Sequence, residues 1–209
     1  MGIRDYKNFG PGSFFHIYNR GNNKQEIFLD DGDYSFFTLR LKQNLYPERF
    51  DELKVQPLPS NSFSLISYCL MPNHFHLILR QNSNIPTSKL ILKVCSSYAK
   101  VFNKKHDRVG HVFQDQFKQI QIESDEYLKW LVSYVCQNPK VAGLVTDPAD
   151  YRWSSYLEHI DISKSGLCDK KVFGEIFQGY NVRNFIDSTY GLIKNKKLEE
   201  KIETDLLLE

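Results

Sequence analysis

The most constraining feature of this 209-residue chain is a pair of strand-like runs separated by a two-residue turn. Residues 63–71 and 74–80 are rich in apolar and aromatic side chains, and Pro72 and Asn73 lie between them. Two such runs around a short polar turn are typical of neighbouring antiparallel strands. The chain therefore contains at least one β-hairpin built mainly from apolar residues, which requires other elements to cover it.

The flanking sequence supplies those elements. Alternating or aromatic patterns predict strands at 13–19 and 117–123, and apolar residues spaced three or four apart predict helices at 30–45, 86–105 and 124–138. Pro139 is expected to end the last of these helices. The resulting order of strands and helices predicts an α+β sandwich of the split β-α-β kind, followed by weaker helical patterns from about residue 163.

Composition excludes several classes of protein. Lysine and arginine number 27 against 25 acidic residues, so the chain is not a polybasic one. The start of the chain lacks the apolar core of a signal peptide, and no stretch approaches about 18 apolar residues. The four cysteines are far apart, which argues against a zinc ribbon or a disulfide framework. We expect a cytoplasmic globular protein without a membrane segment.

One segment, 100–118, departs from the overall charge balance. It holds five lysine and arginine residues against two aspartates, with two histidines between them. Such a strip can follow a phosphate backbone, although a strip of this kind is more often an ordinary solvated face. The candidate nucleic-acid contacts are Arg20, Lys24, Lys100, Lys104, Lys105, Arg108, His111 and Lys118.

The second strand of the hairpin begins with a His-x-His pattern. His74 and His76 are two residues apart, so both imidazoles point to the same face of a strand. Two histidines alone are weak evidence for a metal, because a third ligand is needed. The helix predicted at 124–138 carries Tyr134 and Asn138 four residues apart, hence on one helical face. Two imidazoles with an amide oxygen suit Mg²⁺ or Mn²⁺ better than a structural zinc. Simple packing of Tyr134 in the core is the competing interpretation.

These segments together resemble a known family, the one-tyrosine HUH transposases of the IS200/IS605 type, and within it the REP-associated tyrosine transposases. The resemblance extends over about 15–156, roughly two thirds of the chain. The segments that carry it are Met71-Pro72-Asn73-His74-Phe75-His76, Gly110-His111, Tyr134-Val135-Cys136-Gln137-Asn138-Pro139, Ala142-Gly143-Leu144-Val145 and Trp153-Ser154-Ser155-Tyr156.

The resemblance implies a fold and an activity. The fold is a ferredoxin-like (RRM-like) antiparallel sheet with helices on one face, of the HUH nuclease type, which we expect over residues 1–160. The resemblance does not cover the rest, and the helical pattern there predicts a C-terminal helical extension at 161–209. The activity is cleavage and rejoining of single-stranded DNA at hairpins or palindromic repeats through a 5′-phosphotyrosine. Tyr134 maps to the nucleophile, and His74, His76 and Asn138 map to the ligands of Mg²⁺ or Mn²⁺. Gln116 stands where members usually carry arginine, so one phosphate contact is in question.

Three hypotheses follow. The first is a metal-dependent transposase-like DNA endonuclease that uses Tyr134, acting as a monomer or homodimer near the nucleoid. The second is a non-catalytic module that binds single-stranded nucleic acid on the same sheet, with structural histidines. The third is a metal hydrolase that activates water and does not need the tyrosine. The sequence does not identify the target DNA or the metal.

Overall fold

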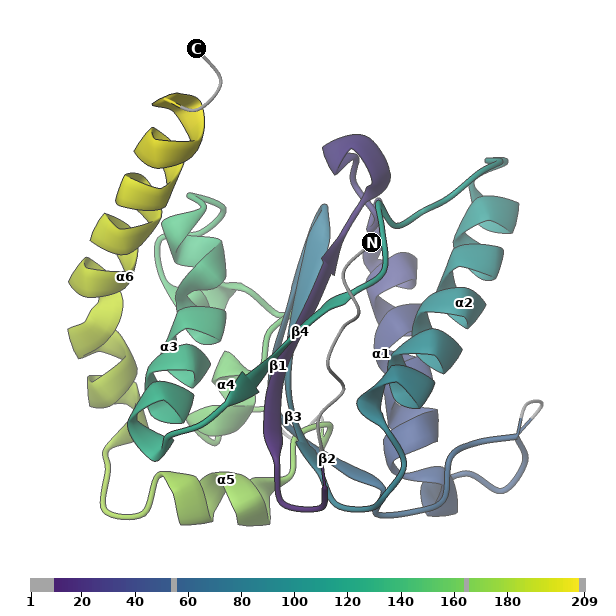
Figure 1. Ribbon diagram of the computed structural model, residues 1–209, viewed down its shortest axis with the longest axis horizontal. Helices are drawn as coiled ribbons and strands as arrows, with labels where there is room; N and C mark the ends of the chain where they lie inside the picture. The colour runs from purple at the N-terminus through teal and green to yellow at the C-terminus, as the bar shows by residue number, and fades with distance from the viewer. Residues whose placement is uncertain (1–9, 54–55, 164–165, 207–209) are drawn as a thin grey trace.

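The computed structural model describes residues 10–53, 56–163 and 166–206, with side chains up to residue 196 (Figure 1). Four strands and six α-helices are present in the described residues. Their bounds are β1 Phe14–Arg20, α1 Asp31–Leu45, β2 Phe63–Met71, β3 His74–Gln81, α2 Thr87–Lys105, β4 Lys118–Ile122, α3 Asp125–Val141, α4 Tyr156–His159, α5 Lys170–Ile176 and α6 Val182–Leu206. Short 3-10 turns lie at 22–24, 47–49 and 148–150.

The strands form one antiparallel sheet in the order β2-β3-β1-β4. The hairpin predicted from the two apolar runs is β2 and β3, with Met71 opposite His74 across the Pro72-Asn73 turn. Strand β1 pairs with β3 over seven residues and holds β4 on its other edge. This is the ferredoxin-like order, so the predicted fold class is confirmed.

Helices cover both faces of this sheet (Figure 1). The larger apolar cluster lies between the sheet and α1 with α2, and includes Phe15, Leu41 and Phe75. The second cluster lies between the sheet and α3, and includes Ile78 and Leu131. The expectation of helices on one face therefore holds for α1 and α2 but is incomplete. Strand residues such as Ile78 are apolar on the second face as well, and they need a helix to exclude water.

Pro139 does not end α3 as the sequence predicts. The helix continues to Val141 with the proline inside it. A proline ring removes one backbone donor from the helix. The last turn is closed instead by the N–H groups of Ala142 and Leu144, which donate to the carbonyls of Asn138 and Pro139. The proline therefore costs the helix one N–H donor, and the hydrogen bonds of Ala142 and Leu144 close the short turn that follows it.

The Trp-Ser-Ser-Tyr segment covers the outer edge of β2. The N–H of Leu70 donates to the carbonyl of Trp153, and the N–H of Ser155 donates to the carbonyl of Tyr68. The hydroxyl of Ser155, which is fully buried, also accepts from the N–H of Tyr68 and lies 2.8 Å from the hydroxyl of Ser67. This segment therefore satisfies backbone groups that an uncovered edge strand would expose.

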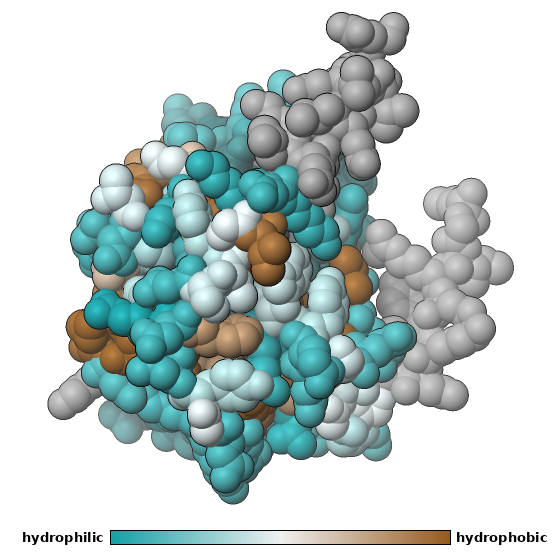
Figure 2. All heavy atoms as spheres, turned by 90° about the vertical axis from the view of Figure 1, so that its left-hand side faces the viewer, coloured by the Kyte–Doolittle hydropathy of each residue, from teal (hydrophilic) through white to brown (hydrophobic). Residues whose placement is uncertain are grey.

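The residues after 160 pack onto the sheet domain. Ile186 and Phe173 belong to the same buried cluster as Leu131 of α3. Figure 2 looks onto the side of α3 and α6, where the described surface is mostly hydrophilic with separate hydrophobic spots. The division at residue 160 stays a prediction, although the two parts share a core. None of the described helices is long and apolar enough to cross a membrane.

Substitution of Ser155 by alanine tests the role of the edge segment. Ser155→Ala removes a buried acceptor from the N–H of Tyr68, so the free energy of unfolding in urea should fall by about 1–3 kcal/mol. Ser188→Ala, on the exposed side of α6, should change the free energy by less than about 0.5 kcal/mol. Equal stability of the two variants would show that the serine does not anchor the segment.

Candidate functional site

One face of the sheet, the side under α3, carries polar aromatic and imidazole side chains on its central strands. On β1, Phe15 and Ile17 belong to the cluster under α1 and α2. The alternate residues His16 and Tyr18 therefore point to the opposite face, toward α3. The same alternation on β3 brings the two predicted histidines to this face, and His76 lies opposite Tyr18 in the strand register.

Three histidines meet on this face. His16 Nε2 and His76 Nδ1 are 2.9 Å apart, so one ring donates a hydrogen bond to the other. Burial lowers the pKa of His16 to about 4, so this ring is neutral near pH 7. His74 Nδ1 donates to Oδ1 of Asn73 at 2.6 Å, and the amide nitrogen of Asn73 donates to the carbonyl of Lys24. In both predicted histidines, His74 and His76, Nδ1 is thus engaged in a hydrogen bond within the protein.

This arrangement fits a metal-binding pair. The ring centroids of His74 and His76 are 5.0 Å apart, at nearly a right angle. Metal-binding histidines usually engage their second ring nitrogen in a hydrogen bond, which fixes the tautomer and the orientation of the ring. Asn73 and His16 supply those hydrogen bonds here. The donor set of imidazoles with a nearby amide is compatible with a divalent cation that keeps several water ligands.

Tyr134 approaches the histidines from α3. The helix begins at Asp125 and is capped by Ser124, whose hydroxyl accepts a backbone N–H of the first turn. Leu131 and Val135 are buried against the sheet, which fixes the rotation of the helix. The ring of Tyr134 lies edge-on to His76, with centroids 5.7 Å apart and an interplanar angle of 88°. The structure therefore places Tyr134 next to His76, although the two residues are far apart in the sequence.

Asn138 lies one helical turn after Tyr134, as the spacing predicts. Its side chain is 1 % exposed, and its backbone carbonyl accepts the N–H of Ala142. A buried amide has little contact with bulk water, so Asn138 could bind a cation only from inside the core. The structure brings His74, His76 and Tyr134 together, and the assignment of Asn138 as a third ligand stays a prediction.

A pocket of about 320 Å³ opens beside these rings. Trp130 stacks against Tyr134 with ring centroids 5.6 Å apart, and His16 and Tyr18 form the opposite wall. His16, Tyr18 and Trp130 were not among the residues predicted for the site. The alternation in the first strand and the three-to-four spacing on the helix carried this information. Neither pattern is distinguishable from core packing until the strand pairing is known.

The predicted basic contacts fall into two groups. Arg20 and Lys24 lie at the end of β1, where the 22–24 turn meets the loop that carries Arg108 and His111 (Figure 1). Backbone hydrogen bonds join these segments, since the N–H of Gln114 donates to the carbonyl of Arg20. This group therefore lies at the sheet end that carries His74, which pairs with Arg20 in the register.

Lysines of the second group lie on different faces of the molecule. Lys118 of β4 is on the site face, with its ammonium 5.9 Å from the centroid of the Tyr18 ring. Lys100, Lys104 and Lys105 are on α2, which covers the opposite face. The single basic strip suggested by the sequence is therefore divided by the sheet, and the contribution of each residue to DNA binding stays a prediction.

Among the described residues, three acidic and histidine side chains elsewhere lie close enough to share a cation. They are Asp30, Asp33 and His106 on the α1 and α2 side. The ammonium of Lys105 already lies 2.8 Å from Asp33, and hydrogen bonds to Asp30 and Asp33 raise the pKa of that lysine. This group is therefore an ion-pair cluster that joins α1 to the end of α2, and it is not the predicted metal site.

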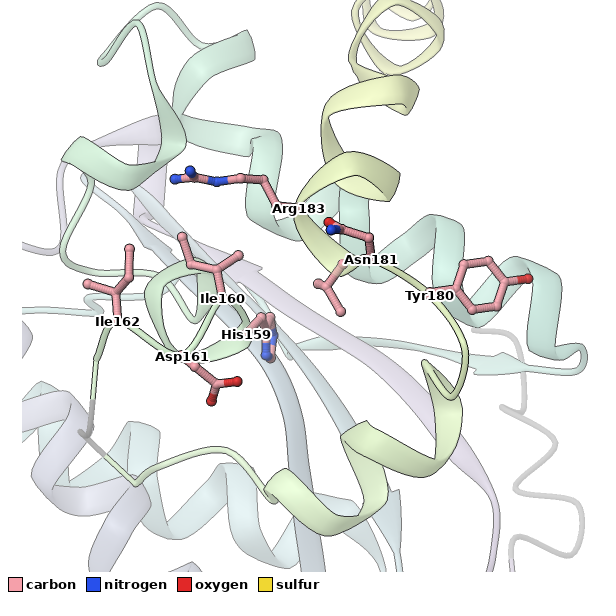
Figure 3. A pocket seen from close by; sticks show the side chains of 8 residues that line it. His159, Ile160, Asp161, Ile162, Tyr180, Asn181 and Arg183 are labelled. Carbon is pink, nitrogen blue, oxygen red and sulfur yellow. The ribbon is translucent and has the colours of Figure 1, made fainter.

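A second hollow, of about 390 Å³, lies between α4 and the start of α6 (Figure 3). It holds none of the predicted site residues. His159 borders it and stacks on Phe173 with ring centroids 3.9 Å apart. Burial, with a smaller effect of Lys170, lowers the pKa of His159 to about 3. Asp161 is paired with the same lysine at 2.8 Å. We therefore assign this hollow to the packing of the extension.

Comparisons with known proteins agree with the geometry. The family model described as "Transposase IS200 like" matches residues 40–138, a span that includes both predicted histidines and Tyr134. Over this span, which is just under half of the chain, the sequence is similar to the IS200-like transposases. The resemblance predicted from the motifs is thereby confirmed.

Two individual proteins are similar to this chain over most of its length. A curated protein of Haemophilus influenzae named "Putative REP-associated tyrosine transposase" is 24 % identical over 180 residues, which is 74 % of this chain and 99 % of that protein. A solved structure of a REP-associated tyrosine transposase bound to a REP hairpin has a TM-score of 0.57 at 15 % identity, and the match covers 87 % of this chain and 93 % of that one. The structural likeness confirms the fold.

His159 makes a prediction about pH. The folded protein keeps this ring neutral, whereas the unfolded chain takes up a proton below its pKa of about 6.5. Stability is therefore greatest above that pH and falls as the pH drops toward 3. From pH 7 to pH 5 the ring should lower the free energy of unfolding by about 2 kcal/mol. In the His159→Phe variant the new ring still stacks on Phe173 but takes up no proton. Its free energy of unfolding, measured in urea, should therefore fall by about 2 kcal/mol less than that of the parent between pH 7 and pH 5. An identical loss in both proteins would contradict the assignment.

Proposed function

We propose that this protein cuts and rejoins single-stranded DNA at hairpin-associated sites, with Tyr134 as the nucleophile. The observation that carries the proposal is the placement of the Tyr134 ring 5.7 Å from His76, inside a group of hydrogen-bonded histidines. A tyrosine at this position is able to attack a phosphate held by the same group. The relationship to IS200-like transposases supports an enzyme that acts on DNA.

The proposed reaction is a phosphoryl exchange that conserves the bond. The hydroxyl oxygen of Tyr134 attacks the phosphorus of a phosphodiester, and the bond between phosphorus and the 3′ oxygen breaks. The tyrosine loses its proton and the leaving oxygen gains one, so the products are a 5′-phosphotyrosine and a free 3′-hydroxyl. Attack by a 3′-hydroxyl on the phosphotyrosine is the reverse step, and it joins two strands without another energy source.

His74 and His76, with Asn138 as the third ligand, are the residues that would hold Mg²⁺ or Mn²⁺. When bound, such an ion neutralises charge on the phosphate as a Lewis acid. Asn73 and His16 keep the two imidazoles oriented before the substrate arrives. The neutral state of His16 matters, because a protonated ring there would repel a cation.

The proposed substrate is a single DNA strand that folds into a hairpin, and the place of action is the cytoplasm near the nucleoid. Arg20, Lys24, Arg108 and His111 at the end of the sheet are suited to contact phosphates of the stem. Lys118 on the site face is suited to the unpaired strand beside the histidines.

Tyr134→Phe tests the nucleophile. The variant keeps the ring and its packing but lacks the attacking oxygen, so covalent protein–DNA adducts on denaturing gels should fall at least about 1000-fold. Affinity for the same hairpin should stay within about threefold. Tyr180→Phe, an exposed tyrosine outside the histidine site, should form adducts at the parent rate. Cleavage by Tyr134→Phe at the parent rate would support a water-activating hydrolase instead.

Removal of the cation tests the histidines. Treatment with EDTA should abolish cleavage and added Mn²⁺ should restore it, because the phosphate charge is then neutralised. His74→Ala and His76→Ala should each lower the rate of cleavage at least about 100-fold, with hairpin affinity largely kept.

His159→Phe, away from the sheet face, is the matched control and should keep the parent rate. Undiminished cleavage by the His76→Ala variant would contradict the assignment. Binding that is insensitive to EDTA, with no cleavage by any variant, would identify the protein as a non-catalytic module.

A further inference from the structure

A series of three aromatic rings leads away from Tyr134 along one face of α3. Tyr127, Trp130 and Tyr134 are spaced by three and four residues, so they lie in a row on the helix. The ring centroids are 6.0 Å apart for the first pair and 5.6 Å for the second, with interplanar angles of 11° and 21°. Tyr127 is 39 % exposed. The row therefore extends from the proposed nucleophile to solvent.

These rings form one wall of the 320 Å³ pocket, which we call the aromatic groove. Its other walls come from His16 and Tyr18 of β1, Ile120 of β4 and Ile193 and Lys196 of α6. Ile120 is 43 % exposed, which is unusual for an isoleucine on the inner face of a sheet. The groove is thus open, lined mainly by rings and apolar side chains, and closed on one side by the C-terminal extension.

Two lysines place positive charge at the groove. The ammonium of Lys196 is 4.8 Å from the centroid of Trp130, and that of Lys118 is 5.9 Å from the centroid of Tyr18. Within the described part of the chain, neither ammonium forms a salt bridge with an acidic side chain. An occupant that brings a flat apolar ring together with negative charge would satisfy both features.

We propose that the aromatic groove binds one unpaired nucleobase of the DNA strand, directly beside the phosphate that Tyr134 attacks. Aromatic walls stack on the face of any base, and lysines contact the flanking phosphates. The volume is at the lower end of the range for small-molecule pockets, about 300 Å³, which suits a single base. The extension then has a role in the site, because α6 supplies one wall. This inference rests on the proposed function.

An abasic scan tests this inference. The DNA is a hairpin oligonucleotide with single-stranded flanks, in which each flanking base is removed in turn, and the protein carries Tyr134→Phe so that it binds without reacting. One abasic position next to the cleaved phosphate should weaken binding by about 10- to 100-fold in fluorescence anisotropy. In a protein that also carries Trp130→Ala, the penalty at that position should fall below about threefold.

Further variants separate stacking from folding. Trp130→Phe keeps an aromatic face and should retain most of the penalty, while Tyr127→Ser, at an exposed position, should reduce it without unfolding the protein. Tyr180→Ala is the matched control, because that ring is also exposed and lies under a lysine, Lys129, but outside the groove. It should leave the penalty unchanged.

Two results would overturn the inference, and they differ from failure of the proposed function. A protein that cleaves the hairpin but shows the same abasic penalty with and without Trp130 does not hold a base in the groove. A protein that cleaves but shows no penalty at any position leads to the same conclusion. Absence of both binding and cleavage would reject the groove and the proposed function together.

Discussion

The strand register between β1 and β3 is the constraint on which the rest of the structure depends. Tyr18 lies opposite His76 and Arg20 lies opposite His74, so the two strands present their polar rings on the same face. Alternate residues of the same strands, such as Phe75, fill the core under α1 and α2. A slip of one residue would turn the imidazoles into that core and the apolar set toward α3, which would be very costly. The packing of one face thus fixes the position of the site on the other.

The second constraint is the packing of α3 against the sheet face that carries the histidines. Apolar residues of the helix, among them Leu131 and Val135, pack with Ile78 of β3 and Ile186 of α6. This packing holds Tyr134 at the histidines without using Tyr134 itself as the main anchor. The extension therefore supports the helix from outside, and the same contacts place Lys196 at the groove. One side of α3 therefore stabilises the fold through apolar packing, and another side carries the proposed nucleophile Tyr134.

The strands and helices were largely predictable because their patterns are local. The hairpin is bounded by Pro72 and Asn73, and the histidine spacing on β3 has one structural meaning on a strand. The prediction that Pro139 ends its helix was wrong because one missing N–H does not prevent the N–H groups of Ala142 and Leu144 from closing a further turn. The helical cover of the second sheet face was not predicted, since apolar residues on both faces of β2 and β3 look like one continuous apolar run.

The site was predictable only in part for a different reason. His74, His76 and Tyr134 carry recognisable spacing, whereas His16 has no motif and becomes visible only when β1 pairs with β3. The basic strip shows the opposite error, because neighbours in sequence such as Lys105 and Lys118 lie on different sides of the sheet. The spacing of residues within one helix or strand predicts which of them share a face. It does not predict which residues of different helices and strands lie close together.

The central claim is that Tyr134 becomes covalently attached to DNA, and peptide mass spectrometry of the protein–DNA adduct tests it most directly. The protein would be incubated with a hairpin oligonucleotide and Mn²⁺, digested with nuclease and protease, and searched for a nucleotide joined through phosphate. We predict that the nucleotide is found on the peptide that contains Tyr134. Attachment to Tyr18 or Tyr127, which also line the groove, or cleaved DNA with no peptide attached, would contradict it.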